Sequence, residues 1–114
     1  MKVVIAGSRS ITDRLAVNEA IRLSGFKITE VVSGQARGVD RLGEAYAKDH
    51  LLPLRCFPAQ WEEYGPIAGP IRNDKMAAYA DAVIVLWDGR SSGALSMARC
   101  ALARGKPLFF RTFL

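Results

Sequence analysis

The chain has 114 residues, half of them hydrophobic (50%), which suits one folded domain over residues 1–114 and excludes a disordered or fibrous protein. No stretch is apolar for long enough to be a membrane span and no secretory signal follows Met1, so we expect a soluble, cytoplasmic protein. Sixteen basic residues against eleven acidic ones give a net charge of +5, which favours an anionic partner such as phosphate, a nucleotide or nucleic acid.

Short β-branched or apolar runs alternate along the chain with longer segments of helical period, as in βα units. In chain order we predict a strand at 2–6, a helix to about 24, a strand at 29–33, a helix at 37–49, a strand at 52–57, a helix at 70–80, a strand at 82–87, a helix at 92–104 and a strand at 108–112. Between 58 and 69 we expect a long loop, a feature that is often functional in a compact domain. The pattern predicts an α/β fold, a Rossmann-like three-layer sandwich with a mainly parallel five-stranded sheet. A strand order of 3-2-1-4-5 would place the first and fourth strands side by side at the switch point.

A few side chains indicate how these elements begin and pack. Ser10 or Thr12 is the expected N-cap of the first helix, because its hydroxyl oxygen can accept a hydrogen bond from the first turn. Leu23 and Leu102 are expected on the inner faces of the first and last helices, at the spacing of the apolar residues around them. Pro70 suits the first position of the third helix, where a missing N–H costs no hydrogen bond.

Four segments bearing glycine and arginine are expected at the carboxyl edge of the sheet. In βαβ units every strand ends and every following helix begins at this edge, and ligands of open α/β sheets bind in the crevice there. Glycine lets backbone N–H groups approach an anion, helix N-termini add unsatisfied donors, and arginine matches phosphate oxygens. The segments are Gly7-Ser8-Arg9, Ser33-Gly34-Gln35-Ala36-Arg37-Gly38, Gly69-Pro70-Ile71-Arg72-Asn73 and Asp88-Gly89-Arg90-Ser91-Ser92-Gly93.

These segments and the helix that follows the second one supply the candidate ligand-binding residues. Asp88 is a candidate for ribose hydroxyls, as carboxylates beside anion sites often are. Trp61 and Tyr64, in the long loop, are expected either to offer an aromatic face to a base or to pack the loop onto the body. The candidates are Gly7, Ser8, Arg9, Ser33, Gly34, Gln35, Arg37, Gly38, Asp40, Arg72, Asn73, Asp88, Gly89, Arg90, Ser91 and Gly93.

Each candidate also has an interpretation without a ligand. Gly7 and Gly34 are typical turn residues, and Ser8 and Ser91 are typical helix caps. Asp40, in a first helical turn, is favoured by the helix dipole alone. The convergence of all four segments on one edge is what favours an anion site.

The sequence contains no arrangement that specifies catalysis. There is no Ser-His-Asp set and no metal-ligand cluster, and the strand-end loops lack the G-K-[ST] of a P-loop. We therefore expect no metal and no required cofactor, only a nucleotide-type ligand. Arg72 and Asp88 are the candidates for any catalytic role.

The four segments, taken in chain order and spanning nearly the whole chain, match a known pattern. They read Gly7-Ser8-Arg9, Ser33-Gly34 through Gly38-Val39-Asp40, Gly69-Pro70-Ile71-Arg72-Asn73 and Trp87-Asp88-Gly89-Arg90-Ser91-Ser92-Gly93. This set resembles the YspA/YpsA-related branch of the SLOG superfamily, which also contains the Lonely Guy enzymes and the DNA-processing protein DprA. The resemblance implies a Rossmann-like domain with a phosphate-binding loop that binds nucleotides or nucleotide-derived ligands, often as a homodimer.

The resemblance to the Lonely Guy enzymes is partial. Those enzymes cleave the N-glycosidic bond of nucleoside monophosphates with an arginine that precedes a methionine and a glutamate in a P-G-G-x-G-T-x-x-E loop. Arg72 with Met76 is similar to the first feature. In the second, Asp88 stands where the proline would, and Ser96 with Met97 falls where the glutamate is expected.

Three functions follow as alternatives. The first is a sensor or sequestering module for ADP-ribose, a mononucleotide or a cyclic nucleotide. The second is a Lonely Guy-like phosphoribohydrolase acting on nucleoside monophosphates. The third, by analogy with DprA, is single-stranded nucleic acid binding, which requires a basic path with exposed aromatic residues.

Overall fold

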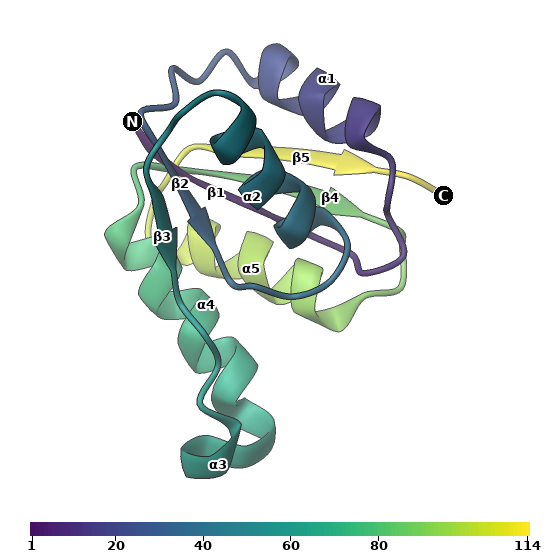
Figure 1. Cartoon of the computed structure of the whole chain (residues 1–114). Coiled ribbons are helices and arrows are strands. Elements are labelled where there is room, and N and C mark those ends of the chain that lie inside the picture. Colours follow the sequence, from purple (N-terminus) through teal and green to yellow (C-terminus); the bar gives the residue numbers. More distant parts are fainter.

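In a computed structural model, which describes all residues from 1 to 114, the chain forms a parallel sheet with helices on both faces (Figure 1). The elements are β1 (Lys2–Gly7), α1 (Arg14–Ser24), β2 (Glu30–Ser33), α2 (Val39–Asp49), β3 (Leu54–Cys56), α3 (Trp61–Tyr64), the 3₁₀ helix η1 (Gly65–Ile67), α4 (Ala68–Tyr79), β4 (Ala82–Trp87), α5 (Ser92–Ala103) and β5 (Leu108–Thr112). The predicted α/β fold with a five-stranded sheet is confirmed.

The order of strands creates the crevice in which the site lies. The sheet has the order β3-β2-β1-β4-β5, and all neighbouring strands are parallel. This is the order that the sequence left open as one that would form a switch point, and β1 lies beside β4 with Val4 opposite Val83. From this central pair the chain continues outward in opposite directions, so the loops that follow β1 and β4 separate at their carboxyl ends.

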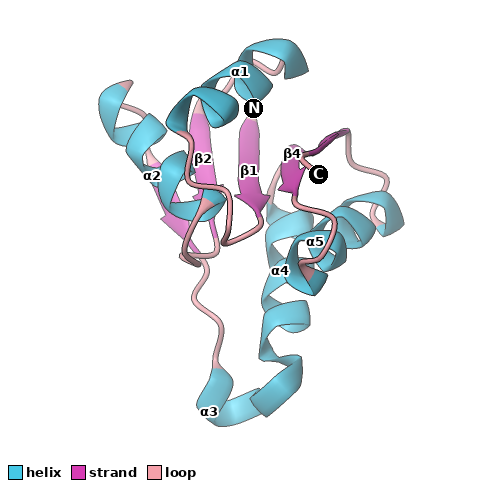
Figure 2. Ribbon diagram, turned by 90° about the vertical axis from the view of Figure 1, so that its right-hand side faces the viewer, coloured by secondary structure: helices cyan, strands magenta, loops and turns pink.

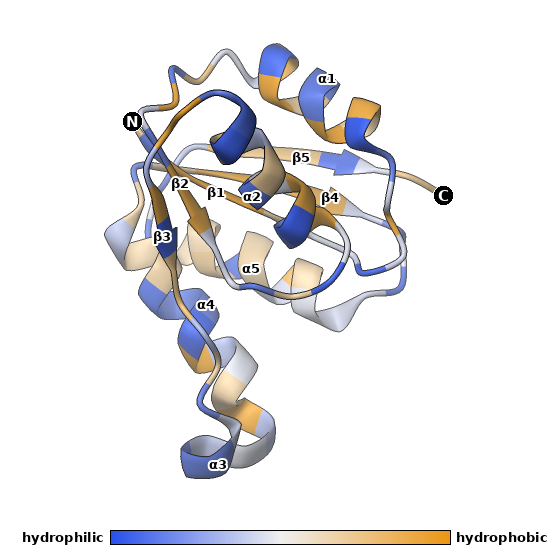
Figure 3. Ribbon diagram, viewed as in Figure 1, coloured by the Kyte–Doolittle hydropathy of each residue, from blue (hydrophilic) through white to orange (hydrophobic).

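The hydrophobic core consists of two layers, one on each face of the sheet. Because side chains alternate along a strand, Val3 and Ile5 of β1 pack with α1 and α2, whereas Val4 and Ala6 pack with α4 and α5. The residues of β4 are buried on both faces up to Leu86, as its continuous apolar run predicted. Figure 2 shows helices on either side of the strands, and Figure 3 shows the hydrophobic strands enclosed by helices with polar outer faces.

Three predictions about helix caps and faces were wrong. The N-cap of α1 is Asp13, whose carboxylate accepts a hydrogen bond from the Leu15 N–H, so the helix starts later than Ser10 or Thr12 would allow. Leu23 is 48% exposed, because it lies two residues beyond the buried Ile21 and therefore points to the opposite side of the helix. Leu102 is 66% exposed, because Ala98 and Ala101 form the inner face of α5 and the next residue turns about 100° away.

The segment predicted as a long loop at 58–69 is largely helical instead. It contains α3 and η1, and α4 begins at Ala68, two residues before Pro70. Pro70 is tolerated there because the first N–H groups of a helix have no partner inside the helix, so a missing one breaks no bond. Together these short helices form an arm that projects beyond the carboxyl edge of the sheet (Figure 1). No helix of the chain is both long enough and apolar enough to cross a membrane.

The contact of α2 with β1 depends on the absence of a side chain at Gly43. A Cβ atom placed there would lie 2.8 Å from Cβ of Ile5, which is buried and cannot move aside. We therefore expect Gly43→Ala to lower the free energy of unfolding by about 1–3 kcal/mol, despite the higher helix propensity of alanine. Urea denaturation measures the change. Lys48→Ala, at an exposed position of the same helix, is the control and should change stability by less than about 0.5 kcal/mol; an unchanged or higher stability of Gly43→Ala would contradict this packing.

Candidate functional site

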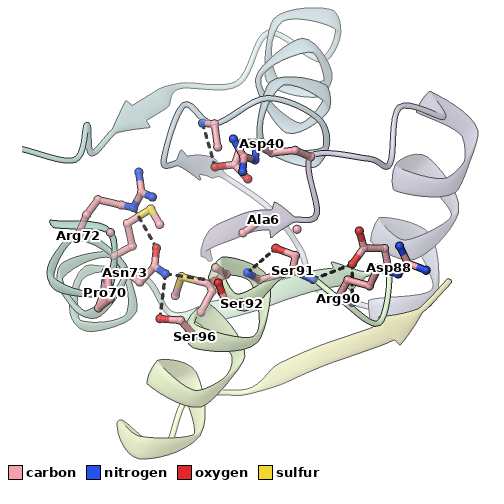
Figure 4. A pocket seen from close by; sticks show the side chains of 18 of the residues that line it. Ala6, Asp40, Pro70, Arg72, Asn73, Asp88, Arg90, Ser91, Ser92 and Ser96 are labelled. Carbon is pink, nitrogen blue, oxygen red and sulfur yellow. Dashed lines mark hydrogen bonds between the residues drawn. The ribbon is translucent and has the colours of Figure 1, made fainter. Parts of the chain in front are cut away.

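A cavity of about 800 Å³ opens at the carboxyl edge of the sheet, beside the ends of β1 and β4. Its walls come from the loops after β1, β2 and β4, from the first turns of α5, and from α3 and α4 (Figure 4). This volume lies within the range of pockets that hold small organic ligands. The cavity thus occupies the switch point at which open α/β sheets bind their ligands.

The first turn of α5 presents unpaired N–H groups to this cavity. Ser91 is the N-cap of α5, and its hydroxyl oxygen accepts a hydrogen bond from the Ala94 N–H at 3.2 Å. Ser92 and Gly93, which precede Ala94, line the cavity, and their N–H groups donate no hydrogen bond within the chain. Two free donors at the positive end of a helix dipole form a favourable site for an anion.

Asp88 organises the loop that leads into α5. Its Oδ1 accepts hydrogen bonds from the N–H groups of Arg90 (2.8 Å) and Ser91 (2.9 Å), and its Oδ2 accepts one from the Ser10 hydroxyl (2.7 Å). The Asp88 N–H donates to the hydroxyl oxygen of the buried Ser8 (2.9 Å), which ties the β4 loop to the β1 loop. The hydrogen bond from Ser10 and those from the backbone hold the pKa of Asp88 well below its usual range. Asp88 is thus a carboxylate whose two oxygens already have donors.

Arg72, on α4, is fixed in the cavity wall by backbone carbonyls. Its Nη1 donates to the oxygen of Gly34 (2.6 Å) and, more weakly, to that of Phe57 (3.4 Å), and its Nε donates to Oδ1 of Asn73 (2.9 Å). A Cβ atom at Gly34 would lie 2.8 Å from this Nη1, so a glycine is needed there to admit the guanidinium group. Half-burial of the group lowers the pKa of Arg72 from its ordinary value.

Asn73 connects α4 to the anion-binding turn of α5. It is buried, and its Nδ2 donates to the oxygen of Gly93 (3.3 Å) and to the Ser96 hydroxyl (3.2 Å) while its Oδ1 accepts from Arg72. All polar atoms of its side chain therefore have partners within the protein. Asn73 acts as a support that holds Arg72 and the first turn of α5 in place.

Asp40, in the first turn of α2, is a buried carboxylate in the cavity wall. The residue is only 4% exposed, and its Oδ2 accepts a hydrogen bond from the Ala36 N–H at 3.3 Å. Burial raises the pKa of Asp40 to about 6, although that hydrogen bond, the charge of Arg72 and the Gly7 amide act in the opposite direction. No ion pair within 4 Å neutralises it. A carboxylate with this pKa in a cavity is typical of functional sites.

Three arginines line the cavity, and none of them forms a salt bridge. Arg9 and Arg90 are exposed, whereas Arg72 is half-buried. The four salt bridges of the chain lie elsewhere and involve other arginines. With Asp40 and Asp88 as its only acidic residues, the lining carries one excess positive charge when both are ionised, which suits an anionic ligand.

The arm supplies an apolar end to the cavity. Trp61 on α3 is 58% exposed and lies against α4, where a Cβ atom at Gly69 would be 3.4 Å from its ring. Pro66 and Pro70 line the same end. Tyr64 does not face this cavity; it lines a smaller one of about 260 Å³ together with Lys75, whose ammonium group lies over its ring. Of the two aromatic residues considered for a base, only Trp61 is in position.

The structure brings more than half of the candidate residues into the cavity wall and leaves the others behind it. Those in the wall are Gly7, Arg9, Asp40, Arg72, Asn73, Asp88, Arg90, Ser91 and Gly93. Those outside it are Ser8, Ser33, Gly34, Gln35, Arg37, Gly38 and Gly89.

The residues outside the wall have identifiable structural roles. Ser33 is buried and donates to Oε2 of Glu44 (2.7 Å) while it accepts from the Gln35 N–H, so it shapes the loop after β2. Gly38 has a φ of 75°, and a Cβ atom there would lie 2.5 Å from the backbone oxygen of Ser8. The glycine thus lets two strand-end loops touch. Arg37 is exposed and does not line the cavity.

Sequence reasoning missed several wall residues. Ser92 lies within the fourth predicted segment and Ser10 directly follows the first, but neither was named as a ligand-binding candidate. Met76, Ser96 and Met97 lie one turn or more into α4 and α5, where only the packing of the two helices shows which side faces the cavity. Ala6, Pro66 and Ala94 were not considered, whereas Ala36, Gly69 and Pro70 lie within the predicted segments and Trp61 was considered for a base.

Comparison with known proteins identifies the relatives of this chain. The model of the YspA, cpYpsA-related SLOG family matches residues 1–64. The X-ray structure of DNA processing protein A (DprA) from Streptococcus pneumoniae is similar, with a TM-score of 0.76 at 23% sequence identity, over 96% of this chain and 49% of that one. At this identity the likeness shows the fold alone, and the chain spans about half the length of that protein. No curated protein matches the chain.

The burial of Asp40 predicts a specific dependence of stability on pH. Its pKa is about 6 in the folded protein, against about 3.9 in an unfolded chain, so the folded state binds its proton more tightly. Below about pH 4 the carboxyl is protonated in both states and costs nothing. As the pH rises through 6, the folded state loses about 3 kcal/mol relative to the unfolded state.

Asp40→Asn removes this titration. We expect the free energy of unfolding of the variant, relative to the parent, to increase by about 3 kcal/mol between pH 4 and pH 7.5 in urea denaturation. Asp49→Asn, at the exposed far end of the same helix, should differ from the parent by less than about 0.5 kcal/mol. If the difference in free energy of unfolding between Asp40→Asn and the parent stays constant with pH, the ionisation of Asp40 does not destabilise the folded protein, and the prediction is wrong.

Proposed function

Because the chain belongs to the YspA, cpYpsA-related SLOG family, we propose that it binds a nucleotide or nucleotide-derived ligand in the cavity at the ends of β1 and β4. The observation that carries the proposal is the anion-binding wall of this cavity. It combines two free N–H groups at the start of α5 with arginines that have no acidic partner.

The proposed position of the ligand's phosphate is the first turn of α5. There the N–H groups of Ser92 and Gly93 are free, and Arg9 and Arg90 line the cavity on two loops that the Ser10–Asp88 hydrogen bond joins. A Cβ atom at Gly93 would meet no atom closer than 4.0 Å, so the backbone of this turn is open to a group that approaches it. Backbone donors and guanidinium groups together make charge-assisted hydrogen bonds to phosphate oxygens.

The base of the ligand is placed at the opposite, apolar end. Trp61 offers an exposed ring in the cavity wall, flanked by Pro66 and Pro70. Stacking of a base on an aromatic ring tolerates all bases because each has a π-face. This end therefore supports a nucleotide-type ligand without selecting one base.

Binding, as a sensor or sequestering module, is favoured over hydrolysis by the state of Asp88 and by the residues at the position expected for a catalytic glutamate. Both oxygens of Asp88 already accept hydrogen bonds, and its depressed pKa makes it a poor proton donor or acceptor near neutral pH. Ser96 and Met97 line the cavity where a hydrolase of the Lonely Guy type is expected to carry its glutamate. Neither side chain can stabilise an oxocarbenium-like centre by charge.

The proposal is tested by isothermal titration of the chain with nucleoside monophosphates, nucleoside diphosphates, cyclic nucleotides, ADP-ribose and a short single-stranded oligonucleotide. Binding of a mononucleotide or ADP-ribose without release of base or ribose phosphate supports the proposed function. Turnover would establish the hydrolase instead, and tight binding of the oligonucleotide alone would establish a nucleic-acid-binding function.

Ser92→Pro is the variant that addresses the anion-binding turn directly. Proline is favoured at the first position of a helix, and the preceding Ser91 already has the extended backbone (φ −63°, ψ 116°) that proline demands. The substitution therefore deletes one free N–H group with little effect on folding. We expect it to weaken nucleotide binding by about 1.5–3 kcal/mol, or roughly 10- to 150-fold, as for a lost hydrogen bond to a charged group.

Ser92→Ala is the matched control, because it removes the hydroxyl and keeps the N–H group. It should retain the affinity of the parent within about threefold, and both variants should have the Tm of the parent within a few degrees. Equal affinity of Ser92→Pro and the parent would remove the phosphate from the first turn of α5.

A further inference from the structure

The polarity of the cavity restricts the part of a ligand that can lie beside Asp40. A phosphate cannot approach this wall, because the buried carboxylate would repel it in a medium of low dielectric constant. The group that contacts Asp40 must therefore donate hydrogen bonds. The only donors of the protein near this carboxylate are backbone amides, the Ala36 N–H at a long 3.3 Å and the Gly7 N–H, and no side chain donates to it.

The position of Asp40 shows which part of a nucleotide this is. Figure 4 shows Asp40 above the floor of the cavity at Ala6, between the end formed by Arg72 with Pro70 and the end formed by Asp88 with Arg90. In any nucleotide the sugar joins the phosphate to the base. A ligand with its phosphate at α5 and its base near Pro70 and Trp61 brings its sugar to the middle of the cavity.

We infer that the ligand carries an intact ribose and that the Asp40 carboxylate accepts hydrogen bonds from the ribose 2′- and 3′-hydroxyl groups. This rests on the proposed function. A vicinal diol matches the two oxygens of a carboxylate, as in the ribose recognition of dinucleotide-binding folds, where the acidic residue also follows β2. The role expected from the sequence for Asp88 thus passes to Asp40.

Arg72 has a supporting part in this arrangement. Its guanidinium lies near the Asp40 carboxylate without an ion pair within 4 Å, because the oxygens of Gly34 and Phe57 and the Asn73 amide take its Nη1 and Nε donors. Asp40 is therefore kept ionisable by a nearby positive charge while its acceptor capacity stays open to a ligand.

The experiment compares ribose with deoxyribose on the folded, full-length chain. The probes are the four ribonucleoside 5′-monophosphates, their 2′-deoxy counterparts and 3′-deoxyadenosine 5′-monophosphate, titrated at pH 7.5. We expect each ribonucleotide that binds to do so about ten- to a hundredfold more tightly than its 2′-deoxy counterpart, because the missing hydroxyl removes one of the two ligand donors to the buried carboxylate.

Asp40→Asn should reduce this ribose preference to less than about threefold while deoxynucleotide affinity falls little. Asp40→Ala is a second variant, in case the side-chain amide of Asp40→Asn still accepts a hydrogen bond from the ribose. Asp49→Asn, exposed at the other end of α2, is the control and should keep the ribose preference of the parent. Loss of the preference in Asp88→Asn but not in Asp40→Asn would return the sugar contact to Asp88 and overturn the inference.

The failures of the inference and of the proposed function differ. If no nucleotide binds, the proposed function fails. If ribo- and deoxyribonucleotides bind equally in the parent, the proposed function stands and the assignment of ribose to Asp40 is wrong. A preference for one base that disappears in Asp40→Asn, with no ribose preference, would assign the carboxylate to a base N–H group and likewise overturn it.

Discussion

The parallel pairing of β1 with β4 is the constraint on which the rest of the site depends. These two buried strands are neighbours in space but are separated along the chain by two strands, four α-helices and a 3₁₀ helix, so their outgoing loops turn to opposite sides. The resulting crevice exists before any side chain is considered. What the sequence adds is the chemistry of the loops that border it, and a cross-link between them: the hydrogen bond from the Asp88 N–H to Ser8.

The loops around the crevice hold each other in place through groups that never reach the cavity. Gly38 allows the β2 loop to touch the backbone of Ser8, and Gly34 allows Arg72 to reach across from α4. Asn73 joins Arg72 to the first turn of α5. A site built in this way is preorganised, because the groups that would contact a ligand are positioned by hydrogen bonds present in its absence.

The periodicity of the sequence was sufficient to predict the fold, and the edge rule for α/β sheets was sufficient to predict which loops meet. Strand and helix types depend on local patterns, and the position of ligands depends on topology, so both are readable from one chain. The roles of individual residues were less accessible. Gly34 looked like a residue that exposes backbone to phosphate, but it admits an arginine side chain, and only the approach of α4 reveals this. The segment at 58–69 was taken for a loop although it contains only two prolines and two glycines, and short helices tolerate both residues at their first positions.

Two aspartates at the same edge of the sheet show how environment separates identical groups. Asp88 accepts three hydrogen bonds and is held ionised. Its carboxylate therefore stabilises the conformation of its own loop. Asp40 is buried with only backbone amides as donors, and burial raises its pKa to about 6. A carboxylate in that position works against the stability of the free protein at neutral pH, since the fold would tolerate a neutral side chain better. Such a destabilising charge in the wall of a cavity has a reason if a bound ligand donates the hydrogen bonds that the protein itself does not supply to the carboxylate.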